Sequence, residues 1–349
     1  MDLLESSDTT SLSYWLNWRF FLCTIWVFIP MLGATFIIWK YEYSYPPKPD
    51  EEGTQEDDLW FRHANNSWMP CVKQIHPICL MMFRIFSFFL ILTALVVDVV
   101  VRGGSLFHYY TQWTLALVAI YFGFGSLLSI YGCLQHWKIY SGSNACNEVV
   151  DAEQGSHVSL IQHEAVTGVD MGKYPYYQEK YYHFRTASRF PSLVYQVSIF
   201  LLSTATCNLQ VYMTAGAVIL TDCLYWCVIF PFLTIKDYDF NFFTVMEHSL
   251  NAILLISETT LNGLQFPWFR ISYFILLTGV YVIFEWIVHA SVSMWWPYPF
   301  LDLSIPSAPV WYLAVALMHL PCYALFALII KAKYYMLHRW FPQVDRSLR

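Results

Sequence analysis

The segment MEHSLNAILLISE, residues 246–258, carries ionisable and amide side chains in a stretch that is otherwise as apolar as a membrane helix. Polar residues recur around it at intervals of three and four, as the series His248, Asn251, Leu255, Glu258 and Asn262 shows. Residues at these intervals share one face of a helix. A neutral imidazole on such a face can accept a proton from a hydroxyl, and a third group can orient the ring. The spacing therefore predicts a polar pocket between helices.

Two further pairs have helical spacing. Glu285 and His289 are four residues apart, and Thr111 and Thr114 are three apart, so each pair shares a helix face. Ionisable side chains inside membrane spans are costly and by default indicate a function. The alternative is that such groups join helices by hydrogen bonds worth ~0.6–2 kcal/mol, without chemistry.

Asp98 and Asp222 are isolated acids within the apolar stretches. The structural alternative is favoured for these two residues, because no other residue of the polar series accompanies them.

Composition sets the class of protein that must position these groups. Hydrophobic residues make up 57% of the 349 residues and charged residues only 13%, and the apolar residues form runs near the ~20 residues that a membrane helix needs. We expect an all-α, polytopic transmembrane helix bundle of about seven spans. The expected spans are 20–40, 83–101, 110–133, one within 192–235, 243–262, 269–290 and 309–331.

The distribution of Lys and Arg predicts the orientation of these spans. With the N-terminus exoplasmic and the C-terminus cytosolic, most basic residues lie in cytosolic segments; the exceptions are Arg19, Arg102 and Lys236, with Arg84 at a helix start. This is a strong positive-inside bias. Residues 192–235 are long enough for two crossings, but two would move the basic C-terminal tail outside, so one crossing at 212–233 is favoured. In this topology the residues that lie toward the exoplasmic side are Thr111, Thr114, His248, Glu285 and His289, whereas Glu258 lies deeper.

The chain divides into six expected segments. They are an N-terminal segment with the first span (1–40), a polar cytosolic linker (41–82), the second and third spans (83–138), a polar cytosolic loop (139–191), the remaining spans (192–334) and a basic cytosolic tail (335–349). The linker contains PPKPDEEGTQEDD, and both polar segments are too poor in apolar periodicity to build a core.

The nine cysteines include no C-x-x-C pair, which indicates neither a disulfide framework nor a zinc site. We expect no metal and no cofactor. The expected partners are the lipid bilayer and a lipid ester substrate, with no nucleic acid; the sequence does not identify a protein partner.

Three segments carry a resemblance to a known family: FHYYTQWTLALVAIYFGFGS, MEHSLNAILLISE and FEWIVHASVSMWWPYPFLD. They resemble the androgen-induced, ADTRP-like integral membrane proteins, and also the rolling-stone-type proteins and plant relatives that are similar to them. The resemblance covers roughly residues 83–334 in the same order.

The resemblance implies hydrolysis of lipid esters within the membrane, especially fatty acid esters of hydroxy fatty acids, by a threonine nucleophile and a histidine. The family threonine follows an aromatic pair early in a span and matches Thr111; the family histidine begins a later span and matches His248. The implied location is the endoplasmic reticulum or the plasma membrane. Thr114 is a second threonine that could be the nucleophile.

The remaining polar residues are expected to line the pocket or to orient the base; they are Asn251, Glu258, Glu285 and His289. Gln112, Asn251 and His289 are the candidate oxyanion donors. Glu258 lies ~15 Å deeper than His248 along an ideal helix, too deep to touch the nucleophile.

Two other functions stay open on the sequence alone. In the first, the protein is a receptor, transporter or membrane adaptor whose polar pocket binds a small ligand or a proton without covalent chemistry. In the second, a metal-dependent membrane enzyme uses His248, Glu258, Glu285 and His289 as ligands.

Overall fold

A computed structural model describes residues 8–43, 69–71, 75–152, 213–233, 245–263 and 267–340. The regular elements of these residues are helices, accompanied by one isolated β-bridge between Pro70 and Asn262. Six of the helices are long and apolar enough to cross a membrane. The chain is therefore an integral, multi-pass, all-helical membrane protein, as its composition predicts.

The first helices follow from local capping. A short helix α1, Leu12–Trp15, leads to α2, Trp18–Ile38, whose first turn is capped by Asn17: its side-chain oxygen accepts from the Phe20 amide at 2.9 Å. The π-helix η1, Trp39–Tyr43, continues α2.

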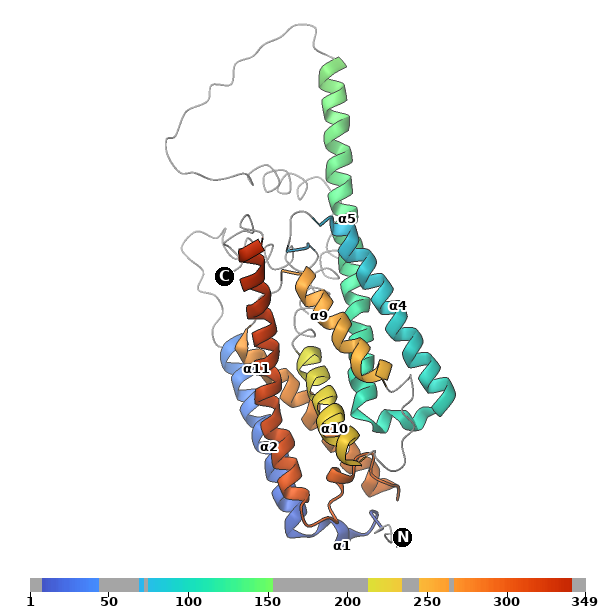
Figure 1. Ribbon diagram of the computed structural model, residues 1–349, viewed down its shortest axis with the longest axis vertical. Coiled ribbons are helices and arrows are strands. Elements are labelled where there is room, and N and C mark those ends of the chain that lie inside the picture. Colours follow the sequence, from blue (N-terminus) through green and yellow to red (C-terminus); the bar gives the residue numbers. More distant parts are fainter. Residues whose placement is uncertain are drawn as a thin grey trace.

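The next two helices form an antiparallel hairpin. Helix α4, Pro77–Arg102, starts on a proline, where the missing N–H costs nothing, and ends at Gly103, whose φ of 83° suits glycine. The 3₁₀ turn η2, Gly104–His108, then reverses the chain into α5, Tyr110–Ala152. Helix α5 runs beyond the expected end of its span at 133, and Figure 1 shows it projecting past the rest of the bundle.

The C-terminal half supplies the remaining helices. They are a helix over 213–224 continued by the π-helix η3, Tyr225–Leu233; η4, Met246–Leu250, continued by α9, Asn251–Leu261; η5, Trp268–Arg270, continued by α10, Ile271–Ser291; η6, Pro299–Leu301; and α11, Ala308–Trp340.

One of the seven expected crossings is not confirmed. The segment expected to span at 243–262 is helical from Met246 to Leu261, but it is shorter than the six helices that qualify as membrane-spanning among the described residues. A seventh crossing therefore stays a prediction, as does the orientation of the termini. Residues 192–212, where a longer crossing was weighed, and most of the two polar segments lie outside the described residues.

The bundle packs in two groups. Helix α4 packs along α5 and also contacts α9, while α2 packs against α10 and α11. Two glycines permit the close approaches: a Cβ on Gly125 would lie 3.4 Å from Cδ of Arg84, and one on Gly216 would lie 2.6 Å from the Phe274 ring. Small residues at such contacts let membrane helices approach closely.

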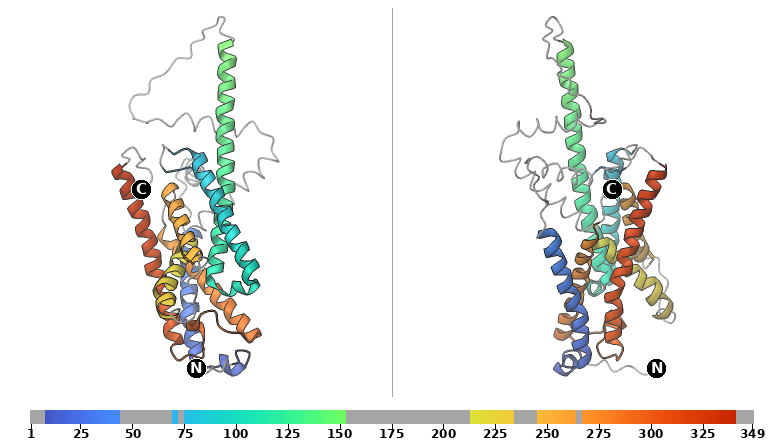
Figure 2. Two further views of the ribbon diagram at one scale, coloured as in Figure 1. Left: turned by 45° about the vertical axis from the view of Figure 1, so that its right-hand side comes forward. Right: turned by 90° about the vertical axis from the view of Figure 1, so that its left-hand side faces the viewer.

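The two ends of the bundle are distinct. Helix α1 and the start of α11 lie at one end, and the end of α11 lies at the other (Figures 1 and 2). The starts of α5 and η4, which carry Thr111 and His248, lie toward the end that holds α1.

Candidate functional site

Thr111 lies in the first turn of α5 and is 6% exposed. The Tyr298 hydroxyl, from the loop between α10 and α11, lies close to the Thr111 side chain and to the amides of Tyr110 and Thr111. These amides have no acceptor within their own helix. Burial raises the pKa of Tyr298 to about 12 although these donors oppose the shift, so Tyr298 is a neutral phenol at pH 7.

Thr114, one turn on, is fully buried. Its hydroxyl donates to the Thr111 carbonyl at 2.8 Å. This bond occupies the Thr114 hydroxyl within the helix itself, whereas the Thr111 hydroxyl contacts a neighbouring loop.

His248 lies in η4 with its ring between two other elements. The imidazole stacks on the Tyr225 ring with centroids 3.8 Å apart and planes 5° apart. Its Nδ1 lies 3.8 Å from Oδ1 of Asp222. Both atoms are buried and lack a hydrogen-bond partner among the described residues, so they face one another at slightly more than hydrogen-bond distance.

A chain of polar side chains connects the neighbourhoods of Thr111 and His248. Gln112, next to Thr111, donates from Nε2 to Asp98 at 2.6 Å. Asp98 pairs with Arg102 at 3.0 Å, and Arg102 reaches Glu247, next to His248, at 3.3 Å. These contacts therefore connect the first turn of α5, which carries Thr111, with η4, which carries His248. Within the described part of the chain, no hydrogen bond joins Thr111 to His248 directly.

Glu285 and His289 lie on α10 and are both fully buried. His289 donates from Nδ1 to the Glu285 carbonyl at 2.8 Å and stacks on Trp296 with centroids 3.7 Å apart. The Glu285 carboxylate lies 3.2 Å from Nδ1 of His108 in η2. This pair therefore joins α10 to the loops on both sides of the Thr111 site, and its polar atoms face partners other than Thr111.

Asn251 is fully buried on the same face as His248. Its side-chain oxygen accepts from the Ala252 amide at 2.8 Å, while its amide nitrogen has no partner among the described residues. Asn251 therefore keeps two N–H groups for a ligand or for water.

Glu258 belongs to a separate buried cluster. One carboxylate oxygen, Oε1, accepts from Arg84 Nη2 at 2.5 Å, from the Tyr121 hydroxyl at 3.0 Å and from the Asn262 amide at 3.2 Å. Lys333 donates to the Asn262 carbonyl. We call these five residues the Arg84–Glu258 cluster; it joins α4, α5, α9 and α11.

The loop that carries Tyr298 is tied to the N-terminal segment. The Tyr14 hydroxyl donates to Asp302 at 2.7 Å and accepts from the Trp296 indole at 3.0 Å and the Leu303 amide at 3.1 Å. Burial, followed by the neighbouring Asp302 carboxylate, raises the pKa of Tyr14. The first described residues of the chain therefore help to fix the loop above Thr111.

Three residues of these arrangements were not expected from sequence reasoning. Asp222 was interpreted as a helix-joining acid, but it faces His248; Arg84 was treated as a charge at a helix start, but it is 2% exposed and pairs with Glu258. Tyr298 lies in one of the segments that carry the resemblance, but nothing in the sequence except its aromatic side chain indicated a place beside Thr111.

The described residues contain no group of three or more His, Cys, Asp and Glu side chains arranged to hold a metal ion. Comparison of the chain with protein-family models, with curated proteins and with solved structures found no match.

Proposed function

We propose that the protein is a membrane-embedded hydrolase of lipid esters, in particular of fatty acid esters of hydroxy fatty acids, with Thr111 as nucleophile and His248 as general base. The similarity of the segments around these two residues to the androgen-induced, ADTRP-like proteins supports the choice of substrate. The geometry supports the roles of the side chains.

The observation that carries the proposal is the buried Asp222–His248 pair. A carboxylate beside Nδ1 selects the tautomer that is protonated on Nδ1, which leaves Nε2 with a lone pair. The separation of 3.8 Å is longer than a hydrogen bond, as catalytic contacts often are before substrate binds. Neither Nδ1 of His248 nor Oδ1 of Asp222 has a hydrogen-bond partner among the described residues. A small movement that brings the two side chains together would therefore give both atoms a hydrogen bond.

In the reaction, Oγ1 of Thr111 attacks the carbonyl carbon of the ester while its proton passes to Nε2 of His248. The tetrahedral adduct collapses, the C–O bond to the alcohol breaks, and the alcohol leaves with the proton from His248. A water molecule then attacks the acyl-threonine with His248 again as base, which releases the fatty acid and restores Thr111. Because no hydrogen bond joins Thr111 and His248 among the described residues, the substrate must bring η4 and the start of α5 closer together.

Tyr298 and the first amides of α5 are the oxyanion donors of this reaction. The oxyanion takes the place of the Tyr298 oxygen at the amides of Tyr110 and Thr111, and the displaced phenol donates to it. Two of the earlier candidates fit less well: Gln112 is bound to Asp98 through Nε2, and His289 donates to the Glu285 carbonyl. The third, Asn251, has an amide nitrogen without a partner among the described residues and stays a candidate.

The test is labelling of the purified full-length chain by a fluorophosphonate probe, together with turnover of a long-chain lipid ester in detergent. Thr111→Ala is expected to abolish both, and His248→Ala to lower turnover by ~10²–10⁴-fold, the scale of a lost general base. Asp222→Asn is expected to lower kcat and to leave KM nearly unchanged, because Asp222 does not touch the substrate.

Thr114→Ala is the matched control, because it removes a buried hydroxyl from the same helix without touching Tyr298; it is expected to keep full activity. Size exclusion confirms that each variant is folded. If the folded wild-type chain neither reacts with the probe nor hydrolyses the ester, the receptor, transporter or adaptor function takes precedence. If Thr114→Ala is inactive and Thr111→Ala active, the nucleophile is one turn further along α5.

A further inference from the structure

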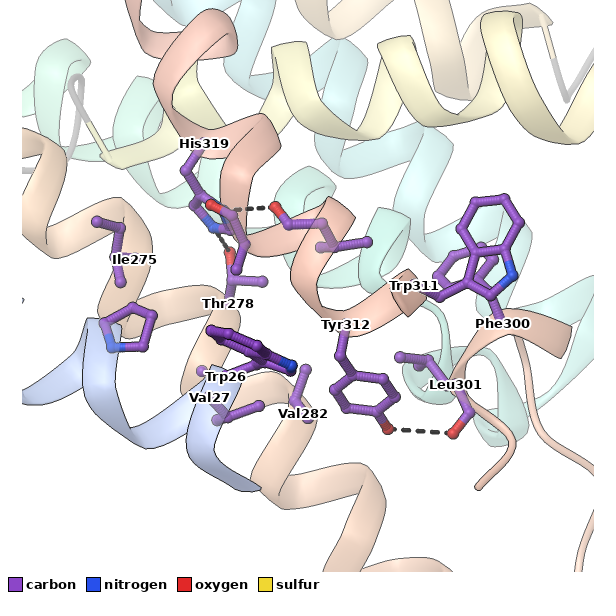
Figure 3. A pocket seen from close by; sticks show the side chains of 14 residues that line it. Trp26, Val27, Ile275, Thr278, Val282, Phe300, Leu301, Trp311, Tyr312 and His319 are labelled. Carbon is purple, nitrogen blue, oxygen red and sulfur yellow. Dashed lines mark hydrogen bonds between the residues drawn. The ribbon is translucent and has the colours of Figure 1, made fainter. Parts of the chain in front are cut away.

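A slot lies between α2, α10 and α11 (Figure 3), and neither Thr111 nor His248 lines it. Trp26 and Val27 of α2 form one wall, Val282 of α10 the floor, and Tyr312 of α11 the opposite wall, as the side chains in Figure 3 show. The cavity measures about 50 Å³, several times the ~10–15 Å³ that one water molecule needs. The slot is therefore large enough for more than one water molecule.

Two residues that line the slot affect how the helices around it pack. Pro30 lies inside α2 and lines the slot, and a proline removes a backbone hydrogen bond and kinks a helix. Gly279 of α10 also lines it, and a Cβ there would lie 2.4 Å from the Met31 sulfur. Larger residues at these positions would bring α2 and α10 into a different packing.

The slot lies at the depth of the bilayer hydrocarbon. Trp26 is ~12 Å along α2 from its first residue and His319 is ~17 Å along α11 from its first residue, in helices that cross a layer ~30 Å thick. The neighbouring residues on the outer faces of these helices are large, apolar and exposed: Ile29 is 61% exposed, Val280 49% and Leu317 56%. The medium outside the slot is therefore lipid hydrocarbon.

His319, Thr278 and Tyr312 line the slot, and their polar side chains already form hydrogen bonds within the protein. Nδ1 of His319 donates to the Val315 carbonyl at 2.9 Å, and Nε2 lies 2.9 Å from the Thr278 hydroxyl, which lies 2.9 Å from the Tyr110 hydroxyl. At the other end the Tyr312 hydroxyl donates to the Leu301 carbonyl at 3.0 Å. Because the side chains of His319, Thr278 and Tyr312 are satisfied within the protein, an apolar occupant leaves none of their hydrogen bonds unmade.

A basic residue lies above the slot. Arg19 is two helical turns before Trp26, on the same face of α2. Its guanidinium donates to the carbonyl of Ser304, in the same loop as Leu301, which lines the slot. Among the described residues no acidic side chain forms an ion pair with Arg19, so its charge is available to an anion at the membrane surface.

We propose that the slot between α2, α10 and α11 binds the hydrocarbon chain of an anionic lipid, whose charged group is held by Arg19 at the level of the first turn of α2. An Arg guanidinium binds a carboxylate or a phosphate through two parallel hydrogen bonds. The ligand is thus an acidic group on a long hydrocarbon chain, and both a free fatty acid and an anionic phospholipid have this chemistry. The site is separate from the proposed ester hydrolysis and does not depend on it.

The experiment uses the full-length chain in nanodiscs of phosphatidylcholine, in a Thr111→Ala background so that hydrolysis plays no part. Three lipids with the same diazirine-bearing chain are compared: a fatty acid, a phosphatidylglycerol and a phosphatidylcholine. After irradiation and proteolysis, mass spectrometry locates the adducts. We expect adducts on slot residues of α2, α10 and α11, at least fivefold more with an acidic lipid than with phosphatidylcholine.

Two pairs of variants test the two parts of the site separately: the slot for the hydrocarbon chain, and Arg19 for the charged group of the lipid. Ala316 lines the slot, and Ala316→Phe is expected to reduce the slot adducts at least fivefold, whereas Ala314→Phe on the same helix, which does not line it, leaves them within twofold. Arg19→Gln is expected to remove the preference for acidic lipids, and Arg19→Lys to keep most of it. Ala316→Leu replaces the Phe variant if size exclusion shows that the latter does not fold.

The pattern of adducts identifies the class of lipid that binds, and certain patterns would contradict the proposal. Adducts from the fatty acid alone identify a free carboxylate as the ligand, and adducts from phosphatidylglycerol alone identify a phospholipid. Adducts spread equally over the lipid-facing surface, slot adducts unchanged by filling Ala316, or equal labelling by phosphatidylcholine would each overturn the proposal. None of these results bears on Thr111, so failure here leaves the hydrolase to be judged by its own assay.

Discussion

Replacing Arg84 tests how the Arg84–Glu258 cluster stabilises the bundle. Arg84 and Glu258 have side chains 3% and 0% exposed and approach to 2.5 Å. Arg84 supplies two of the four hydrogen bonds that Glu258 Oε1 accepts, and it also donates to Ser129 at 2.6 Å. Arg84→Met therefore leaves a buried carboxylate without its counter-charge, which costs ~3–5 kcal/mol when one member of a buried pair is removed.

The double variant separates the cost of a broken pair from the value of the pair itself. Arg84→Met together with Glu258→Leu removes both charges, and replacement of a buried pair by apolar residues is often neutral or stabilising. We expect the double variant to be more stable than Arg84→Met alone. Arg102→Met is the comparison: the Arg102 side chain is 37% exposed, whereas its partners Asp98 and Glu247 are 4% and 12% exposed. Its removal is therefore expected to cost less than that of Arg84 but more than the ~0–1 kcal/mol of a fully exposed pair.

The assay is thermal unfolding in detergent, followed by intrinsic tryptophan fluorescence. At ~2–4 °C per kcal/mol, Arg84→Met is expected to lower Tm by ~6–20 °C, and Arg102→Met by less than Arg84→Met. The reasoning is refuted if Arg84→Met unfolds at the wild-type temperature. It is also refuted if the fall in Tm of the double variant equals the sum of the falls caused by Arg84→Met and Glu258→Leu, because additivity means that the two side chains are not coupled.

Two further predictions concern the loop and the topology. Tyr14→Phe removes the acceptor of a Trp296 indole and a Leu303 amide and the donor to Asp302, and should lower the free energy of unfolding by ~1–3 kcal/mol; an unchanged Tm would mean that the N-terminal segment does not hold this loop. A tag placed after Arg349 should resist protease in intact cells and be cleaved after permeabilisation, because the basic tail is expected in the cytosol; cleavage in intact cells would contradict the expected orientation.

The helices and their inward faces could be predicted from the sequence alone. Membrane-spanning length and apolar composition are properties of a local stretch, so α2, α4, α10 and α11 lie close to where hydropathy predicts them. The polar face of α9 was predictable for a similar reason, since helical spacing is also local. Its members are indeed buried: His248 is 7% exposed, and Asn251 and Glu258 are fully buried.

The lengths of two elements were not predictable from hydropathy. The apolar signal of α5 ends near 134, but the helix continues to Ala152, because hydropathy marks where the apolar stretch ends and not where the helix ends. For the span expected at 243–262, the structure describes η4 and α9 from Met246 to Leu261.

The amino-acid sequence determined that this chain crosses a membrane in helices and that certain of its polar side chains must face inward, because the cost of exposing a charge or an amide to lipid applies at each position by itself. Only the tertiary structure decided which groups meet. Glu258 pairs with Arg84, 174 residues away in the chain, and His248 faces Asp222. A buried charge requires a partner, but its identity depends on how the helices pack, and packing is set by the shapes of many side chains at once.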